Sequence, residues 1–462
     1  MKAFTLKVGK YHALSLVLSA ALLPCSVYSQ SLEQAVAYTL DTNPELRVAY
    51  TRFKVNEKKV EQAEAGYLPT IDLTGGIGYE YTDSPGTRRD GNDNTEELMR
   101  RELGISLKQN IFSGFHTQSE VERTSYATSA EQWRLHSKAE DLALQVSKVY
   151  VDLIKDNALV ALSEKYLVSH EEIHEMIKLR TESGFSSSAD LSQINGRLAK
   201  AHSIVIAAKN NALDSKTSFY RLIGQKPENL VIPMPDASKL PKTQAQGLQL
   251  ALDNHPTIRA AGNDIHSAKA QYESSKSSYY PNVSLELNAN FNDDLDGEDG
   301  TGARDVGGEN NEFQAMLRFS YNLYSGGKDK AYSKETAYKK SEAYELNRNV
   351  QRQVKEGFIL SWDAFEQLNL QKKYIKMHVI SAKDTQSDYA EQFKIGQRSL
   401  LDLLDTQNEL YQSRRDFLEA EFSEITAQYR ILNAMGLLVD TLKVTRPKSW
   451  QGEEQFAGGV EL

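Results

Sequence analysis

Cysteine and proline are both scarce in this chain of 462 residues. Cys25 is the single cysteine, and it lies in a short apolar stretch near the N-terminus. The rest of the chain therefore has neither disulfides nor thiol chemistry. The eleven prolines leave two long gaps, between Pro85 and Pro227 and between Pro281 and Pro447. Because proline breaks helix interiors, gaps of this length predict very long helices.

Long hydrophobic runs are also missing. The apolar stretch "ALSLVLSAALLP" follows Lys2, Lys7 and Lys10 and is short for a bilayer span. Small residues ending at Ser29 come next, so we interpret residues 1–29 as a secretory signal peptide. No later stretch approaches the roughly 18 apolar residues of a membrane helix, and we expect none in the mature chain. Short alternating strands would still let an exported chain cross a membrane as a β-barrel.

Positive charge is the minority charge. Lys and Arg number 54 against 63 Asp and Glu, which gives a formal net charge of −9. The expected signal peptide contains three lysines and no acidic residue, so the mature chain would be more acidic still. An acidic chain gives no reason to expect a nucleic-acid partner.

The chain contains an internal duplication. Four segments of the first half recur, with changes, 212 residues later in the second half. The pairs are NPELRVAY at 43 and HPTIRAAG at 255, GYLPTIDL at 66 and SYYPNVSL at 278, NIFSGF at 110 and NLYSGG at 322, and GFSSSADL at 184 and GQRSLLDL at 396. Chance similarity would not keep one register over this distance. We expect a first repeat at 30–226, a proline-rich linker at 227–244 and a second repeat at 245–437.

Each repeat has the same predicted order of elements. A helix comes first, at about Leu32–Ala65 and Gln246–Ser277. Two segments of alternating apolar and polar residues follow, which predict strands with one apolar face. Residues 115–183 and 328–395 then predict helices on the order of 100 Å long, each followed by a glycine turn and a shorter returning helix. The strands suit a transmembrane barrel, but four such strands would equally build a soluble sheet with one face on a core.

This combination resembles the TolC family of outer-membrane efflux and secretion channels over about Ser31–Leu437. The resemblance rests on the duplication, on the NPEL and YLP segments, on NLYSGG, and on the G-x-R-x-x-L-D-x-L-D pattern from Gly396. It implies an α+β membrane protein, a homotrimer in which four strands per chain form one 12-stranded outer-membrane β-barrel. A long α-helical coiled-coil barrel would continue it into the periplasm. Four strands alone leave two open edges, which lipid does not tolerate, so physical reasoning also favours an oligomer.

The function implied by the resemblance is a passive exit duct in contact with outer-membrane lipid, with no enzymatic chemistry and no cofactor or metal. Its partners would be a periplasmic adaptor (membrane fusion) protein, docking at the helix-turn tips Gly184 and Gly396, and an inner-membrane ABC transporter. The chain looks closest to the type I secretion branch that exports large adhesins. A multidrug or small-molecule efflux channel is the alternative, and a soluble periplasmic coiled-coil scaffold is a more distant one. We expect residues 438–462 to form a flexible periplasmic tail.

The resemblance also assigns a gate. Asp402 and Asp405 fall on the aspartates that ring the closed periplasmic mouth of such channels, and their spacing places both on one helix face. Closely spaced carboxylates repel each other where water is restricted, so the ring should favour cations. The earlier repeat has Asp190 and Gln193 at these positions. The paired charge therefore belongs to one repeat only.

A latch beside the gate is implied only in part. Arg398 falls on the latch arginine of the family, and its partner region falls on Ala189 and Asp190. Phe393 lacks the hydroxyl of the neighbouring latch tyrosine, and Ala189 lacks that of a threonine. Only the pair Arg398–Asp190 is therefore expected.

Two other motifs are weaker. HEEIH, from His170 to His174, matches the zinc-protease pattern, but it lies in a long periodic helix with no third ligand marked, so we expect a solvated helix face. The acidic segment that begins near Asp293 lacks EF-hand spacing and is expected to be an external loop. No catalytic triad, P-loop or dinucleotide fingerprint is convincing, so we expect no enzyme.

Overall fold

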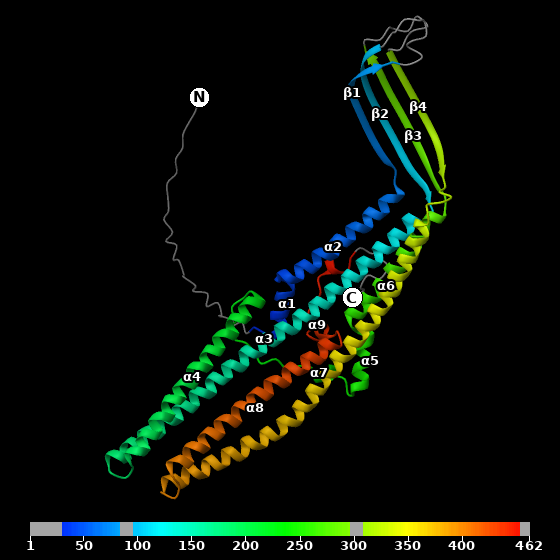
Figure 1. The fold of residues 1–462 in the computed structure, drawn as a ribbon. Coiled ribbons are helices and arrows are strands. Elements are labelled where there is room, and N and C mark those ends of the chain that lie inside the picture. Colours follow the sequence, from blue (N-terminus) through cyan, green and yellow to red (C-terminus); the bar gives the residue numbers. More distant parts are fainter. Residues whose placement is uncertain (1–29, 84–95, 296–307, 453–462) are drawn as a thin grey trace, which may run out of the picture.

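The computed structural model describes residues 30–83, 96–295 and 308–452 as an elongated molecule with a sheet at one end and long paired helices below it (Figure 1). Residues 1–29, where we expect the signal peptide, lie outside the described residues. So do residues 296–307 of the expected acidic loop and residues 453–462 of the expected tail.

The same order of elements occurs twice. The first half contains α1 (Leu32–Thr42), α2 (Pro44–Glu64), β1 (Thr70–Thr82), β2 (Glu96–Ser113), α3 (His116–Glu182) and α4 (Ser188–Ile223). The second half contains α5 (Gln244–Asn254), α6 (Pro256–Ser274), β3 (Asn282–Leu295), β4 (Gly308–Ser320), α7 (Lys328–Lys394) and α8 (Leu400–Ala434). Each element of the second half begins 212 residues after its counterpart. The short helix α9 (Leu438–Thr441) and 3₁₀ turns at Ala65–Tyr67, Ala237–Lys239, Ser277–Tyr279 and Lys448–Trp450 complete the described elements.

The first helix of each repeat is divided, which corrects the single helices expected at Leu32–Ala65 and Gln246–Ser277. Asn43 and His255 have extended backbones and cap the helices α2 and α6, which begin at Pro44 and Pro256. A residue before proline avoids the helical conformation, whereas proline itself fits the first helical position. The chain therefore changes direction at both places.

The four strands form one antiparallel sheet in the order β1-β2-β3-β4. On one face, the register sets Lys108 opposite Glu286, and their Nζ and Oε1 atoms lie 3.4 Å apart. The other face is apolar and open, with Ile71 69% and Ile77 73% exposed. A soluble sheet would bury such a face on a core, but none of the described elements covers it. Within one chain β1 and β4 are edge strands.

The long helices form two hairpins that lie side by side (Figure 1). One consists of α3 and α4, the other of α7 and α8, and α3 also contacts α2, α6 and α8. The helices α3 and α7 have 67 residues each, which corresponds to a length on the order of 100 Å. In the described part of the chain, no helix combines the length and the apolar character needed to cross a membrane.

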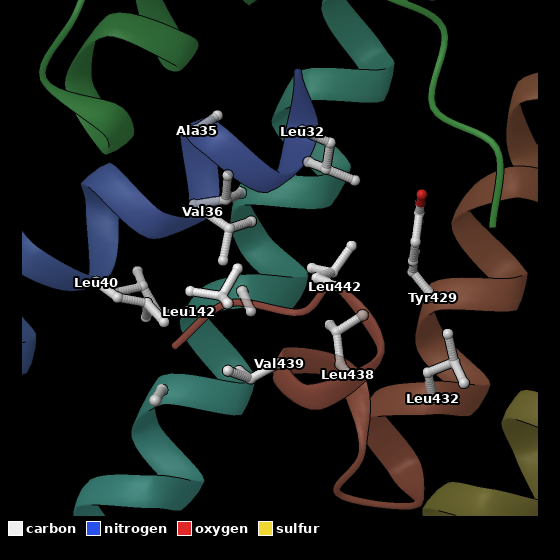
Figure 2. Packing of buried hydrophobic residues seen from close by; sticks show 14 of the residues in the cluster. Leu32, Ala35, Val36, Leu40, Leu142, Tyr429, Leu432, Leu438, Val439 and Leu442 are labelled. Atoms are coloured by element: carbon white, nitrogen blue, oxygen red, sulfur yellow. The ribbon is translucent and has the colours of Figure 1, made fainter. Parts of the chain in front are cut away.

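The main hydrophobic core lies midway along the helices, and the segment after α8 is part of it. Leu438, Val439 and Leu442 are buried between α1, α3 and α8 (Figure 2). Further along, Trp450 is buried, and its carbonyl oxygen accepts a hydrogen bond from Nε2 of Gln132 at 2.7 Å. The expectation of a flexible tail is therefore wrong for residues 438–452, because their apolar side chains fill the core beside α3.

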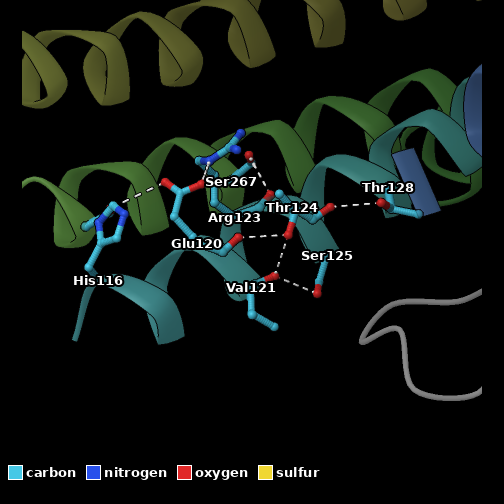
Figure 3. A network of polar contacts seen from close by, with 9 residues as sticks. His116, Glu120, Val121, Arg123, Thr124, Ser125, Thr128 and Ser267 are labelled. Atoms are coloured by element: carbon cyan, nitrogen blue, oxygen red, sulfur yellow. Dashed lines mark hydrogen bonds and ion pairs between the residues drawn. The ribbon is translucent and has the colours of Figure 1, made fainter. Parts of the chain in front are cut away.

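Polar contacts fix the start of α3 below the sheet (Figure 3). Ser274 on α6 hydrogen-bonds Nδ1 of His116 at 3.0 Å. One turn on, Glu120 pairs with Arg123 at 2.8 Å, and Oγ of Ser267 on α6 donates to the carbonyl of Arg123 at 3.0 Å. These contacts join the first turns of α3 to α6, so the sheet and the helices are held at a defined junction.

Candidate functional site

Both long helices end at a glycine turn at the tip of a hairpin. Gly184 and Gly396 have φ angles of 78° and 77°, in the left-handed region that favours glycine. The next N–H groups, of Phe185 and Gln397, donate back to carbonyls of the last helical turn at 2.7 and 2.9 Å. The turns that were expected from the sequence are therefore compact helix ends, and they place the following residues at the tips.

The first aspartate after each turn completes the cap of its returning helix, whose N-cap residue is Ser187 in α4 and Ser399 in α8. Oδ2 of Asp190 accepts hydrogen bonds from Ser187 N at 3.1 Å and Oγ at 2.8 Å, and from Ser186 Oγ at 2.9 Å. Oδ2 of Asp402 accepts from Ser399 N at 3.2 Å and Oγ at 2.9 Å. These bonds lower the pKa of both carboxyls, with Ser187 and Ser399 as the largest causes. Both side chains are thus ionised and fixed, in capping boxes that the Ser-x-x-Asp spacing could have indicated.

Asp405 has a different environment from Asp402. Its Oδ1 accepts a hydrogen bond from Nη2 of Arg197 at 3.0 Å, an ion pair that joins α8 to α4. The two predicted ring carboxylates are therefore unequal, because one is held by its own helix start and the other by a basic residue of the neighbouring hairpin. Arg197 was not singled out from the sequence.

The predicted latch residues have other partners within one chain. Nε of Arg398 donates to Oε1 of Gln392 at 2.9 Å, and its guanidinium lies 4.1 Å from the ring centroid of Tyr389. Among the described residues no ion pair joins Arg398 to Asp190. Arg398 is exposed and is held by the end of α7.

A further arginine links the two hairpins near their tips. The guanidinium of Arg180 on α3 lies 5.0 Å from the ring centroid of Phe393 on α7, and its Nη2 donates to the carbonyl of Lys394 at 3.3 Å. Phe393, which stands where the family has the latch tyrosine, is buried, and its ring packs against the guanidinium of Arg180. Behind it lies a small separate core formed by Ile173, Ile177, Ile194, Phe393, Leu400, Leu403 and Leu404.

The HEEIH segment lies on α3, and its two histidines have different environments. His170 is buried, and its Nδ1 lies 3.0 Å from the carbonyl oxygen of Tyr166. The expectation of a solvated face is wrong for His170, which packs against the rings of Tyr166 and, through it, Tyr411. Burial lowers the pKa of His170. Over residues 30–83, 96–295 and 308–452, no group of three or more metal-ligating side chains could hold an ion.

Known proteins resemble this chain over almost its whole length. The family model described as "Outer membrane efflux protein" matches residues 36–225 and 247–437. The outer membrane efflux protein BepC of Brucella suis biovar 1 is 23% identical, with 93% of this chain and 90% of the relative covered. The outer membrane protein TolC of Vibrio cholerae is 22% identical over 92% and 95%, and the toluene efflux pump outer membrane protein TtgC of Pseudomonas putida is 23% identical over 88% and 83%.

Solved structures show the same fold. CusC matches with a TM-score of 0.76 at 14% identity, covering 87% of this chain and 91% of that one. The CmeC outer membrane channel of Campylobacter jejuni matches with a TM-score of 0.74 at 15% identity, covering 88% and 86%. These findings confirm the expected TolC-like fold, with four antiparallel strands per chain and long helices. Since both repeats match its model, the chain belongs to the outer membrane efflux protein family, whose members are channels of the outer membrane that reach into the periplasm and are not enzymes.

Proposed function

We propose that three copies of this chain close into the outer-membrane exit duct of a tripartite type I secretion system. The observation that carries the channel is the open sheet, whose apolar face is exposed and whose edge strands β1 and β4 are unpaired in one chain. Pairing β4 of one copy with β1 of the next would satisfy both edges, and three copies of four strands would close the barrel. The apolar face would then contact lipid.

The same closure would join the helices. The helices below the sheet follow the same side-to-side order as the strands. The helices α2 and α4 lie on the β1 side of a subunit, and α7 lies on the β4 side (Figure 1). Large apolar side chains on these outer helices are exposed, among them Ile206 and Leu213 on α4 and Leu370 and Met377 on α7. Burying them against a second copy would be favourable at about 25 cal/mol per Å².

The gate belongs to the same proposal. One Asp402 and one Asp405 from each copy would meet at the axis as a ring of carboxylates that favours cations. Arg398 is exposed, and Oδ1 of Asp190 has no partner among the described residues of its own chain. The latch Arg398–Asp190 would therefore form between neighbouring copies.

The tips would receive the periplasmic adaptor. Beside the two glycine turns, Phe185 is 86% exposed and Ile395 is 69% exposed. Apolar side chains this prominent at a protein surface are typical of docking sites. An adaptor bound there would connect the duct to an inner-membrane ABC transporter, which supplies the energy.

The exported substrate is proposed to be a large adhesin. This part of the proposal rests only on the resemblance of the sequence to the type I secretion branch. Multidrug or small-molecule efflux is the second candidate, because relatives such as TtgC are named for efflux of toluene.

Deleting the gene distinguishes export of a large adhesin from efflux of small molecules. We expect the deletion strain to lose a large protein from its surface and medium, to retain that protein inside the cell, and to keep its tolerance of solvents and antibiotics. Restoring the gene should restore export. Unchanged secreted proteins together with increased drug sensitivity would contradict secretion and favour efflux.

The gate is tested by recordings in planar bilayers. Replacing Asp402 and Asp405 with Asn removes the charges and keeps the side-chain size, and an amide oxygen at position 402 can still accept the hydrogen bonds from Ser399. We expect cation selectivity and block by divalent cations to weaken. Unchanged currents would contradict the ring.

A further inference from the structure

The contact between Arg197 and Asp405 joins charges from two different hairpins. Nη2 of Arg197 and Oδ1 of Asp405 lie 3.0 Å apart, although 208 residues separate them in sequence. The side chain of Arg197 is 28% exposed and that of Asp405 is 59% exposed. The arginine is therefore partly enclosed at the joint of the hairpins, whereas the aspartate faces outward.

Asp402 forms no ion pair with any of the described residues. Its nearest contacts are the N–H and hydroxyl of Ser399, both neutral donors, and Oδ1 has no partner among the described residues. Arg398 contacts Gln392 and Tyr389, and its charge only helps to lower the pKa of Asp402 without forming an ion pair with it. Asp402 is therefore ionised, and no ion pair neutralises its charge.

Other basic groups at the tip are not placed to replace Arg197. Arg180 contacts Phe393 and the carbonyl of Lys394. Lys200 lies one turn after Arg197 on α4 and is exposed, but the described residues give it no ion pair with Asp405. Arg197 is thus the basic side chain that contacts this carboxylate.

We propose that Arg197 sets the charge of the periplasmic constriction and thereby the ion selectivity of the channel. It neutralises Asp405 while the two hairpins are together, so that the constriction presents the charge of Asp402 alone. When the hairpins separate, the contact between α4 and α8 is lost, and each subunit adds one negative charge to the mouth. The inference rests on the proposed ring at Asp402 and Asp405.

The experiment compares Arg197→Gln, Asp405→Asn and the double variant in planar bilayers with asymmetric KCl. The permeability ratio of K⁺ to Cl⁻ is measured from the reversal potential. We expect Arg197→Gln to raise the ratio, because the mouth then presents two carboxylates per subunit that no ion pair neutralises, instead of one. Asp405→Asn should lower it because Arg197 is left unpaired, whereas the double variant removes both charges of a neutral pair and should match the unaltered channel.

Two controls make the result specific. Lys200→Gln removes an equal charge one turn away and should leave the ratio unchanged, and Arg197→Lys should preserve it. The yield of trimer in the outer membrane shows that each variant folds.

The outcomes distinguish this inference from the gate proposal. Equal ratios for Arg197→Gln and the unaltered channel, with a changed ratio in Asp402→Asn, would overturn the role of Arg197 and leave the ring intact. Unchanged ratios in Asp402→Asn and Asp405→Asn would overturn the ring itself. A rise in Lys200→Gln as large as in Arg197→Gln would show a general surface-charge effect and would also overturn the inference.

Discussion

Glu140 fixes the C-terminal segment to α3 and offers a quantitative test. Its carboxylate is buried, and Oε2 accepts hydrogen bonds from the N–H groups of Leu438 at 2.9 Å and Val439 at 3.3 Å. Nη2 of Arg446 lies 3.3 Å from Oε1. One carboxylate thus caps α9 and pairs with the arginine that follows it.

Burial is the largest influence on this group and raises the pKa of Glu140 from 4.5 to about 7. A carboxyl with a raised pKa in the folded chain binds its proton more tightly there than in the unfolded chain. Its contribution to stability is therefore full below about pH 4.5 and is lost as the pH rises through about 7. Each pKa unit corresponds to about 1.4 kcal/mol, so we expect the contribution of Glu140 to fall by about 2–3 kcal/mol between pH 5 and pH 8. The buried His136, which packs on Trp450 and whose pKa is lowered to about 3, acts in the opposite direction, so the contribution is measured against a Glu140 variant.

Two substitutions at this position separate charge from shape. Glu140→Gln is neutral and of similar size, so from pH 5 to pH 8 the unaltered channel should lose about 2–3 kcal/mol of stability relative to this variant. Glu140→Leu leaves two buried N–H groups and Arg446 without their acceptor and should cost about 3–5 kcal/mol.

The assay is limited proteolysis of the C-terminal segment in the purified channel, together with its thermal unfolding, at both pH values. A smaller loss of stability from pH 5 to pH 8 in the unaltered channel than in Glu140→Gln would refute the reasoning. It would mean that Arg446 and the two N–H donors outweigh burial.

Three other predictions concern the tips. The hydrogen bonds from Ser399 lower the pKa of Asp402, so its charge is lost only as the pH falls through a value below 3.8. We therefore expect channels with Asp405→Asn alone to keep their cation selectivity to a lower pH than channels with both Asp405→Asn and Ser399→Ala. Gly396→Ala forces a side chain into the left-handed region and should destabilise the turn by about 1–2 kcal/mol, seen as faster hydrogen exchange at the tip, whereas Gly262→Ala inside α6 should not. Arg398→Ser should raise the conductance of the closed channel, and a conductance that stays at the closed level would contradict the latch.

Much of this fold was predictable because its signals are local. The alternation in Ile71, Leu73 and Ile77 predicts a strand wherever that strand packs. The proline-free segments and the glycines at 184 and 396 similarly specify long helices and where they end. The duplication supported each of these predictions a second time.

The errors have a different physical origin. The pair Arg197–Asp405 depends on how two hairpins lie beside each other, and nothing near either residue records it. The segment after α8 contains too few apolar residues to show a period, yet they complete a core built mostly by α1, α3 and α8. His170 is buried for the same reason, since tertiary packing placed it against Tyr166.

The central claim is that three copies of this chain form one outer-membrane channel. The most direct test is the mass of the particle extracted by detergent from outer membranes, measured with the tip residues unaltered. The account predicts three chains per particle. A single chain recovered from the periplasm without detergent would contradict it.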